Sequence, residues 1–129
     1  LKVIMPKAFT LIELLIVIAL LGILSTIGVV SFTGHIATTH KKKAEVTINS
    51  LYLAQSEYQS NNSEYCISDC NTQDKIVKNL LDEVDNLKDQ NYNFTILNTS
   101  DGYTIRAKHK TSSCTLTLTH KSVKDESGC

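Results

Sequence analysis

One acidic side chain stands where a charge is costly. Glu13 lies near the start of a long apolar run from Phe9 to Phe32. At about 1.5 Å per residue, a helix over this run measures about 36 Å, which exceeds a hydrocarbon core of about 30 Å. An acid at the centre of such a span costs about 2.5–3.5 kcal/mol on insertion scales, and less near its edge. A carboxylate retained at that cost indicates ion pairing with a partner, and the alternative is that it reaches out to the lipid headgroups.

Four cysteines form the second group with chemical potential: Cys66, Cys70, Cys114 and Cys129. They allow three pairings. The most economical joins Cys66 to Cys70 and Cys114 to Cys129, and the alternative links one of the first two cysteines to one of the last two. In the chain-entropy account, the short loop contributes about 2 kcal/mol and the longer loop about 3 kcal/mol.

Basic side chains gather in two clusters that could bind an anionic partner. The first consists of residues 41–43 with His35 and His40, and the second of Lys108, His109, Lys110, His120, Lys121 and Lys124. We interpret the first as a contact with lipid headgroups and the second as a solvated edge strand. No aromatic side chains that could stack on bases are interleaved among the lysines, so nucleic acid is the alternative partner.

The motifs of catalysis are missing from the sequence. It contains no phosphate-binding loop, no nucleophile elbow and no HExxH helix, so we expect neither an enzyme nor a cofactor. His109 and His120 flank Cys114, but their spacing matches no common zinc finger, and we expect no metal. Thirteen basic and thirteen acidic residues cancel, so the net charge indicates no partner.

Helical periodicity continues beyond the apolar run. Residues 33–60 carry a stripe that includes Ala44, Ile48 and Leu51, which predicts an amphipathic helix. Val46 and Leu53 form a second apolar ridge beside this stripe. One helix is therefore predicted from Phe9 to Ser60, with one face for a globular domain and another for neighbours.

The remaining residues, 61–129, have room for one small globular head. Apolar residues at helical spacing predict a second helix over 73–88 that packs against the edge of a sheet. Alternating residues predict three antiparallel strands over 92–97, 103–108 and 114–119, with a hairpin loop that ends at Gly102. So small a sheet needs the long helix and the disulfides to stabilise it.

The N-terminal residues carry a family resemblance. Lys7-Ala8-Phe9-Thr10-Leu11-Ile12-Glu13, with the apolar run and Gly22 in mid-span, resembles the processing site of type IV prepilins and type II secretion pseudopilins. In that family a membrane peptidase cuts immediately before the Phe, and the new N-terminus is methylated. Ala8 stands where the family usually has Gly, and Val30 where it commonly has a kinking Pro. An ordinary secretory signal, the competing interpretation, has a shorter apolar region.

This resemblance implies a processing scheme and a fold. Residues 1–8 would be the leader, with the cut between Ala8 and Phe9 and methylation of Phe9; residues 9–32 would be the membrane-spanning and assembly half of the first helix. Glu13 of one subunit would meet the free amine of Phe9 in its neighbour, so that each charge offsets the desolvation of the other. The implied fold is the α+β ladle of pilins, with a long helix packed on a small antiparallel sheet. The Cys114–Cys129 pair resembles their disulfide-bounded C-terminal region.

The implied function is that of a structural subunit of a type IV pilus-like filament. Its partners would be identical or related pilins, prepilin peptidase and the pilus assembly machinery. The alternative is a minor pilin or pseudopilin that acts as a tip or binding module in adhesion, DNA uptake or protein secretion. Lys2 and Lys7 precede the span, which favours a cytoplasmic N-terminus in the bacterial inner membrane, although residues 41–43 oppose this orientation. Assembly would carry the rest into an extracellular pilus or periplasmic pseudopilus, where cysteines pair.

Overall fold

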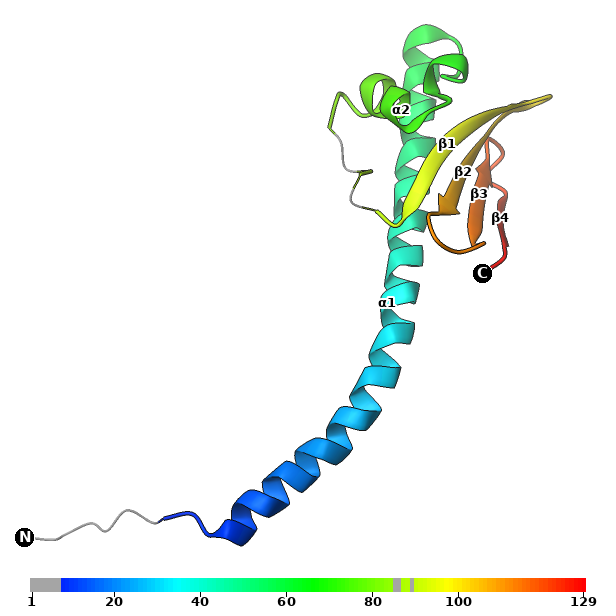
Figure 1. Cartoon of the computed structure of the whole chain (residues 1–129). Coiled ribbons are helices and arrows are strands. Elements are labelled where there is room, and N and C mark those ends of the chain that lie inside the picture. The colour runs from blue at the N-terminus through cyan, green and yellow to red at the C-terminus, as the bar shows by residue number, and fades with distance from the viewer. Residues whose placement is uncertain (1–7, 85–86, 89) are drawn as a thin grey trace, which may run out of the picture. The chain divides into compact units, whose positions relative to one another are not determined.

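The computed structural model describes residues 8–84, 87–88 and 90–129, and Val30 by its backbone alone. The expected leader residues Lys2 and Lys7, and the side chain of Val30, lie outside the described residues. The elements are the helix α1 (Leu11–Asn62), a 3-10 turn η1 (Ser68–Cys70), the helix α2 (Gln73–Leu80) and the strands β1 (Tyr92–Thr99), β2 (Gly102–His109), β3 (Thr115–Thr119) and β4 (Lys124–Ser127) (Figure 1). The chain divides into two compact units, Leu1–Thr38 and Thr39–Cys129.

The first unit contains the apolar part of α1. Its large side chains are exposed around the whole helix, as the exposed fractions of Leu15 (62%) and Ile27 (64%) illustrate. Among the described residues, α1 is the one helix that is long and apolar enough to cross a membrane. Apolar surface of this extent requires lipid or other protein to cover it.

The second unit is built on the amphipathic part of α1. Ala44, Ile48, Leu51 and Gln55 are buried along one stripe of the helix, at the three- and four-residue spacing of a single face. Gln55 lies in this stripe although it is polar, because its amide meets the backbone of Cys66. Gln55 Nε2 donates to the Cys66 carbonyl, and the Cys66 N–H donates to Gln55 Oε1 at 2.9 Å. Because Gln55 is polar, apolar periodicity alone did not predict it as part of the stripe.

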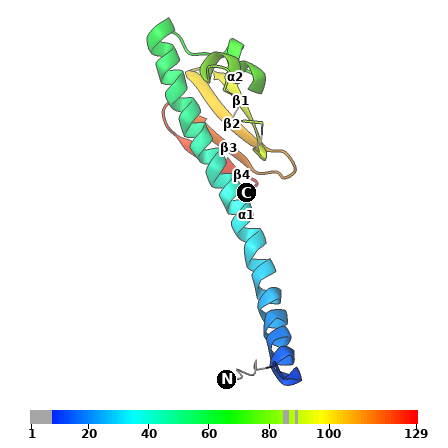
Figure 2. The same ribbon diagram turned by 90° about the vertical axis from the view of Figure 1, so that its left-hand side faces the viewer.

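A four-stranded antiparallel sheet in the order β1-β2-β3-β4 completes this unit. Alternate residues of the first three strands are buried in the same core as the α1 stripe: Tyr92, Phe94, Ile96, Tyr103, Ile105, Ala107, Leu116 and Leu118. Figure 2 shows the sheet behind residues 39–62 of α1. The α+β pilin fold expected from the sequence is therefore confirmed, with four strands instead of three.

The predicted helix over residues 73–88 was wrong for the described residues after Leu80, and residues 85 and 86 lie outside the described residues. α2 ends at Leu80, because Asp82 and Glu83 adopt left-handed backbone angles (φ of 48° and 65°) that cannot continue a helix. Val84 is 64% exposed, whereas Leu87 is buried without being part of a helix. α2 packs beside β1, where Gln73 Oε1 accepts the Phe94 N–H at 3.2 Å.

The hairpin between β1 and β2 is tighter than the predicted loop, since Thr99 and Gly102 are already paired. Gly102 has a φ of 151°, and a Cβ there would lie 2.8 Å from the ring of His120. Glycine is therefore required at this position by both the backbone and the close ring. Two disulfides, Cys66–Cys70 and Cys114–Cys129, lie in the same unit, and the second attaches the end of the chain after β4 to the start of β3.

Candidate functional site

Glu13 forms a capping box at the start of α1. Its Oε2 accepts the backbone N–H of Thr10 at 2.8 Å and lies 3.1 Å from the Thr10 hydroxyl. In return, the Glu13 N–H donates to Thr10 Oγ1 at 3.3 Å. These reciprocal bonds satisfy amides that would otherwise have no partner at the helix terminus. Thr-x-x-Glu before an apolar run is the ordinary sequence signal of this cap, but the cap was not among the predicted roles of Glu13.

The cap leaves part of the Glu13 carboxylate available. Both bonds from Thr10 engage Oε2, and within the described residues Oε1 accepts no hydrogen bond. Phe9, the residue after the expected cut, is 83% exposed. One carboxylate can therefore cap its own helix through one oxygen and present the other to a second group.

The solvent-facing side of the sheet carries a polar and basic surface. We call this side the outer surface; it consists of Arg106 and Lys108 of β2 with the surrounding residues Asn93, Thr95, Thr104, Thr115, Thr117 and Thr119. These residues alternate with the buried ones along their strands, so they point away from the core. The outer surface thus combines two cations with a field of hydroxyl groups, and Leu97, paired with Thr104, and Asp125, paired with Thr117, lie on the same side.

Arg106 and Lys108 occupy an interior strand, where Lys108 is paired with Asn93 of β1 and with Thr115 of β3. Arg106 is paired with Thr95 of β1 and with Thr117 of β3. Arg106 Nε and Thr95 Oγ1 are shielded from solvent and have no hydrogen-bond partner in the part of the chain that the structure describes. The interpretation of this basic cluster as an edge strand was wrong for Lys108, because β2 lies between β1 and β3.

The other members of the two basic clusters lie elsewhere. Lys41 Nζ pairs with Glu126 at 2.6 Å, and this hydrogen bond holds the pKa of Lys41 above its usual value. Lys42 pairs with Glu45 at 3.0 Å within α1. Lys121 pairs with Asp101 across the two hairpin turns at 3.3 Å. These lysines bind acids of their own chain, so the structure separates them from Arg106 and Lys108.

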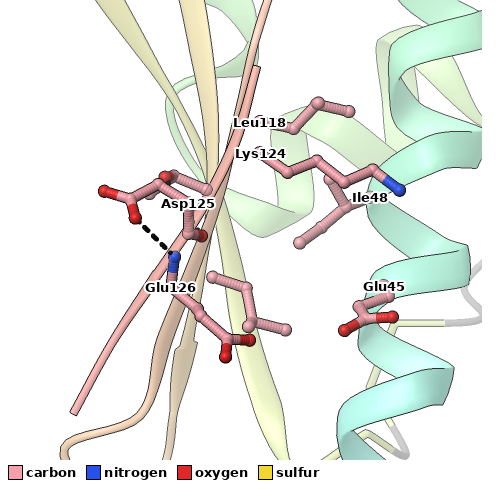
Figure 3. A pocket seen from close by; sticks show the side chains of 8 residues that line it. Glu45, Ile48, Leu118, Lys124, Asp125 and Glu126 are labelled. Atoms are coloured by element: carbon pink, nitrogen blue, oxygen red, sulfur yellow. Dashed lines mark hydrogen bonds between the residues drawn. The ribbon is translucent and has the colours of Figure 1, made fainter. Parts of the chain in front are cut away.

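A groove lies between α1 and the strands β3 and β4, on the side of the sheet opposite the outer surface. It has a volume of about 320 Å³ and an apolar floor of Ile48, Leu116 and Leu118. Figure 3 shows the charged side chains of Glu45, Lys124 and Glu126 around it. The groove exists because the inward-facing residues of β4 are charged and stay at its rim. Lys124 therefore belongs to this groove rather than to the outer surface.

The residues of the zinc hypothesis do not form a metal site. Cys114 is bonded to Cys129, and the described residues contain no group of three or more His, Cys, Asp or Glu that could hold a metal. His120 lies among aromatic rings, with its ring centroid 6.0 Å from that of Tyr103. The ring of His109 lies edge-on to that of Tyr92 at 4.9 Å. Both histidine rings therefore pack against tyrosine rings of the globular unit.

Two known protein families match this chain. One match covers the N-terminal residues and the other covers most of the rest of the chain. Residues 6–29 match the family described as "Prokaryotic N-terminal methylation motif", the N-terminus of prepilins. Residues 30–127 match the family described as "Type IV minor pilin ComP, DNA uptake sequence receptor". The chain therefore belongs to the ComP family of type IV minor pilins. No curated protein and no solved structure matches it.

Family membership agrees with the apolar helix and the fold. The chain is a pilin subunit, and membership implies other pilus subunits as partners and processing by prepilin peptidase. The exposed apolar part of α1 fits a membrane-anchored pilin. Pilin families are structural, in keeping with the absence of enzyme motifs from the sequence.

Proposed function

We propose that the chain is a minor pilin that waits in the inner membrane and then joins a type IV pilus. It is cut between Ala8 and Phe9, methylated at Phe9 and anchored through residues 9–32 with a cytoplasmic N-terminus. The methylation motif over residues 6–29 supports this scheme. Lys41 and Lys42, which oppose the orientation by charge counting, have structural partners in Glu126 and Glu45 that account for their presence.

Glu13 is the residue that docks the subunit in the filament. After the cut, the Phe9 amine lies four residues away, about 6 Å along a helix. In a stack of parallel helices, Glu13 Oε1 of one subunit meets the Phe9 amine of the next, while Oε2 keeps the helix cap. Each charge offsets the desolvation of the other, which fixes the axial register of neighbouring subunits.

The second part of the proposal is that the outer surface binds DNA. The observation that carries it is the pair Arg106 and Lys108, which face solvent side by side on an interior strand within a field of hydroxyl groups. Arginine, lysine and threonine are the side chains that contact phosphate oxygens in protein–DNA complexes. The family description, "DNA uptake sequence receptor", supports the same ligand.

The chemistry of the outer surface favours contacts to the phosphate backbone. It has no aromatic ring on which an unpaired base could stack, so duplex DNA suits it better than a single strand. Binding through phosphates releases counterions, and affinity therefore falls steeply as salt increases. Contacts to base edges would have to come from the loops that border the sheet.

Fluorescence anisotropy with a labelled duplex and the full chain in non-ionic detergent micelles tests this proposal. The double variant Arg106→Ala/Lys108→Ala should bind more weakly and lower the slope of log K against log salt by about two. Lys78→Ala is the matched control, because Lys78 is an exposed cation on α2, away from the outer surface. A flat response of the unmodified chain at low salt would refute DNA binding.

A further inference from the structure

The ring of His109 organises the loop that follows β2. Its Nδ1 accepts the backbone N–H of Thr111 at 3.2 Å and that of Ser112 at 3.0 Å. A ring nitrogen that accepts two backbone donors carries no proton of its own. In this arrangement Nδ1 is the acceptor for both N–H groups, which the Nε2–H tautomer of the ring allows, and the loop is also held by Lys110 N–H to the Asn91 carbonyl and by Ser113 Oγ to the Gly128 carbonyl.

The ring is held in place from two sides. His109 is the partner of Tyr92 in the register of β1 and β2, and the two rings meet edge to face. Its backbone N–H donates to the Cys114 carbonyl at 2.8 Å, which closes the loop of residues 110–113 against β3. This loop begins two residues after Lys108, so it borders one end of the outer surface with its hydroxyls and amides.

Protonation of the ring conflicts with these contacts. An imidazolium Nδ1–H would point at two N–H donors, and both hydrogen bonds would be lost. The ionisable groups around the ring are the Tyr92 phenol, Lys41, Glu45 and Glu126 beyond that phenol, and Lys108 and Lys110 along its own segment. Among the described residues, no carboxylate forms a hydrogen bond or ion pair with the ring, where it could hold the charged form.

We propose that His109 is a positioning residue for DNA binding. Its neutral ring holds the loop of residues 110–113 beside the outer surface, and its protonation releases the loop and weakens the complex with DNA. The inference rests on the DNA binding proposed above. Histidine is the side chain whose charge ordinarily changes between about pH 5 and pH 8, so the effect falls in an accessible range.

NMR of the full chain in detergent micelles tests the loop directly. At pH 7.5 the imidazole of His109 should show the Nε2–H tautomer, and the amides of Thr111 and Ser112 should be protected from exchange. At pH 5.5 both amides should lose their protection. His109→Asn is the conservative variant, because an asparagine oxygen can accept the N–H two residues ahead and does not titrate in this range. In that variant, the Thr111 amide should stay protected at both pH values.

Measurements of DNA affinity at two pH values test whether His109 positions the loop for DNA binding or has a structural role alone. His109→Asn should match the unmodified chain at pH 7.5 and bind the duplex about fivefold more tightly than it at pH 5.5, since it keeps the loop hydrogen bond. His40→Asn replaces a histidine of α1 that lies outside this loop and should behave like the unmodified chain at both pH values.

Two results would overturn the inference: amides of Thr111 and Ser112 that stay protected at pH 5.5, or equal DNA affinities of the unmodified chain and His109→Asn at that pH. A different result would remove the proposed function instead. If the chain binds no DNA at either pH while the loop still opens, the DNA proposal fails and the link between His109 and the loop stands.

Discussion

The two parts of α1 obtain their stability from different sources. Up to Thr38, large apolar side chains such as Leu15 and Leu20 are more than half exposed. From Thr39 onward, one stripe is buried, with Leu51 fully and Ile48 almost fully covered. A single helix thus contains a part whose partner lies in its own chain and a part whose partner must come from outside.

This difference separates folding from assembly. The core, both disulfides and the outer surface belong to the unit Thr39–Cys129, which carries its own packing. None of the described side chains in the exposed part of α1 is buried in that core. Changes in the two parts should therefore affect different measurements, and the following predictions test that separation.

The largest effect is expected at Glu13. Glu13→Ala should still be processed, yet its incorporation into sheared pili should fall by about tenfold or more, because the Phe9 amine of the neighbour loses its counter-charge. Quantitative immunoblotting of sheared filaments measures incorporation. Urea unfolding of the globular unit should not change.

Glu13→Gln is the matched control, because glutamine retains the capping box and removes only the charge. If the ion pair drives docking, both variants assemble poorly. Normal incorporation of Glu13→Gln would show that the helix cap, and not the charge, is what assembly needs.

Two leucines of α1, two residues apart, test whether one stripe of the helix after Thr38 is buried in the core. Leu51→Ala removes a fully buried side chain and should lower the free energy of unfolding by about 2–5 kcal/mol. Leu53→Ala removes a side chain that is 66% exposed and should change it by less than about 0.5 kcal/mol. Urea unfolding followed by circular dichroism measures both, and equal losses would contradict the assignment of the buried stripe.

The two disulfides should contribute differently to the free energy of unfolding, because they close loops of different length. Cys114→Ser/Cys129→Ser should cost about 3 kcal/mol, since this bond closes the longer loop, and Cys66→Ser/Cys70→Ser about 2 kcal/mol. Both losses should appear in unfolding of the globular unit, with membrane insertion of the apolar part unchanged. A larger loss from the short loop would argue against the chain-entropy explanation.

The smallest expected effect is a loss of folding stability at alkaline pH, caused by ionisation of buried tyrosines. Burial raises the pKa of Tyr92 and that of Tyr103 above the usual value. The folded state therefore holds these protons longer, so the stability is complete below about pH 10 and is lost as the pH rises through the raised values, by up to about 1.4 kcal/mol per pH unit for each group.

Unfolding midpoints between pH 9 and pH 11 measure this loss, and Tyr103→Phe should make the decline shallower. The apolar part of α1 contains no tyrosine, so the loss caused by tyrosine ionisation should be confined to the globular unit. A decline as steep in Tyr103→Phe as in the unmodified chain would assign the effect to other groups.

Much of the fold could be predicted because apolar periodicity reports it directly. The stripe of α1 and the alternation in β1, β2 and β3 are visible in the sequence. β4 was missed because Lys124, Asp125 and Glu126 show no apolar alternation; its order comes from pairing with β3 and from the bond at Cys129. The end of α2 was missed because Asp82 turns left-handed within a pattern that continues.

The candidate sites were harder to predict, since neighbours in sequence need not share a surface. Lys108 and His109 are adjacent, yet alternation along β2 places them on opposite sides of the sheet. Arg106, two residues earlier, joins Lys108 on the outer surface, although the sequence analysis had left it out of the cluster. The bonds of Glu13 with Thr10 had a clear sequence signal that was overlooked in favour of the membrane argument.

The charged composition of β4 bears on how closely packed pilin domains avoid pairing through their sheet edges. β1 is covered by α2, whereas β4 is a short outer strand in which three of four residues are charged. Short strands with charged side chains resist the addition of another strand. Pilin domains along a filament stand at very high local concentration, where a long apolar edge would fuse one domain to the next. On this ground we expect the charged β4 to oppose edge-to-edge pairing between neighbouring heads.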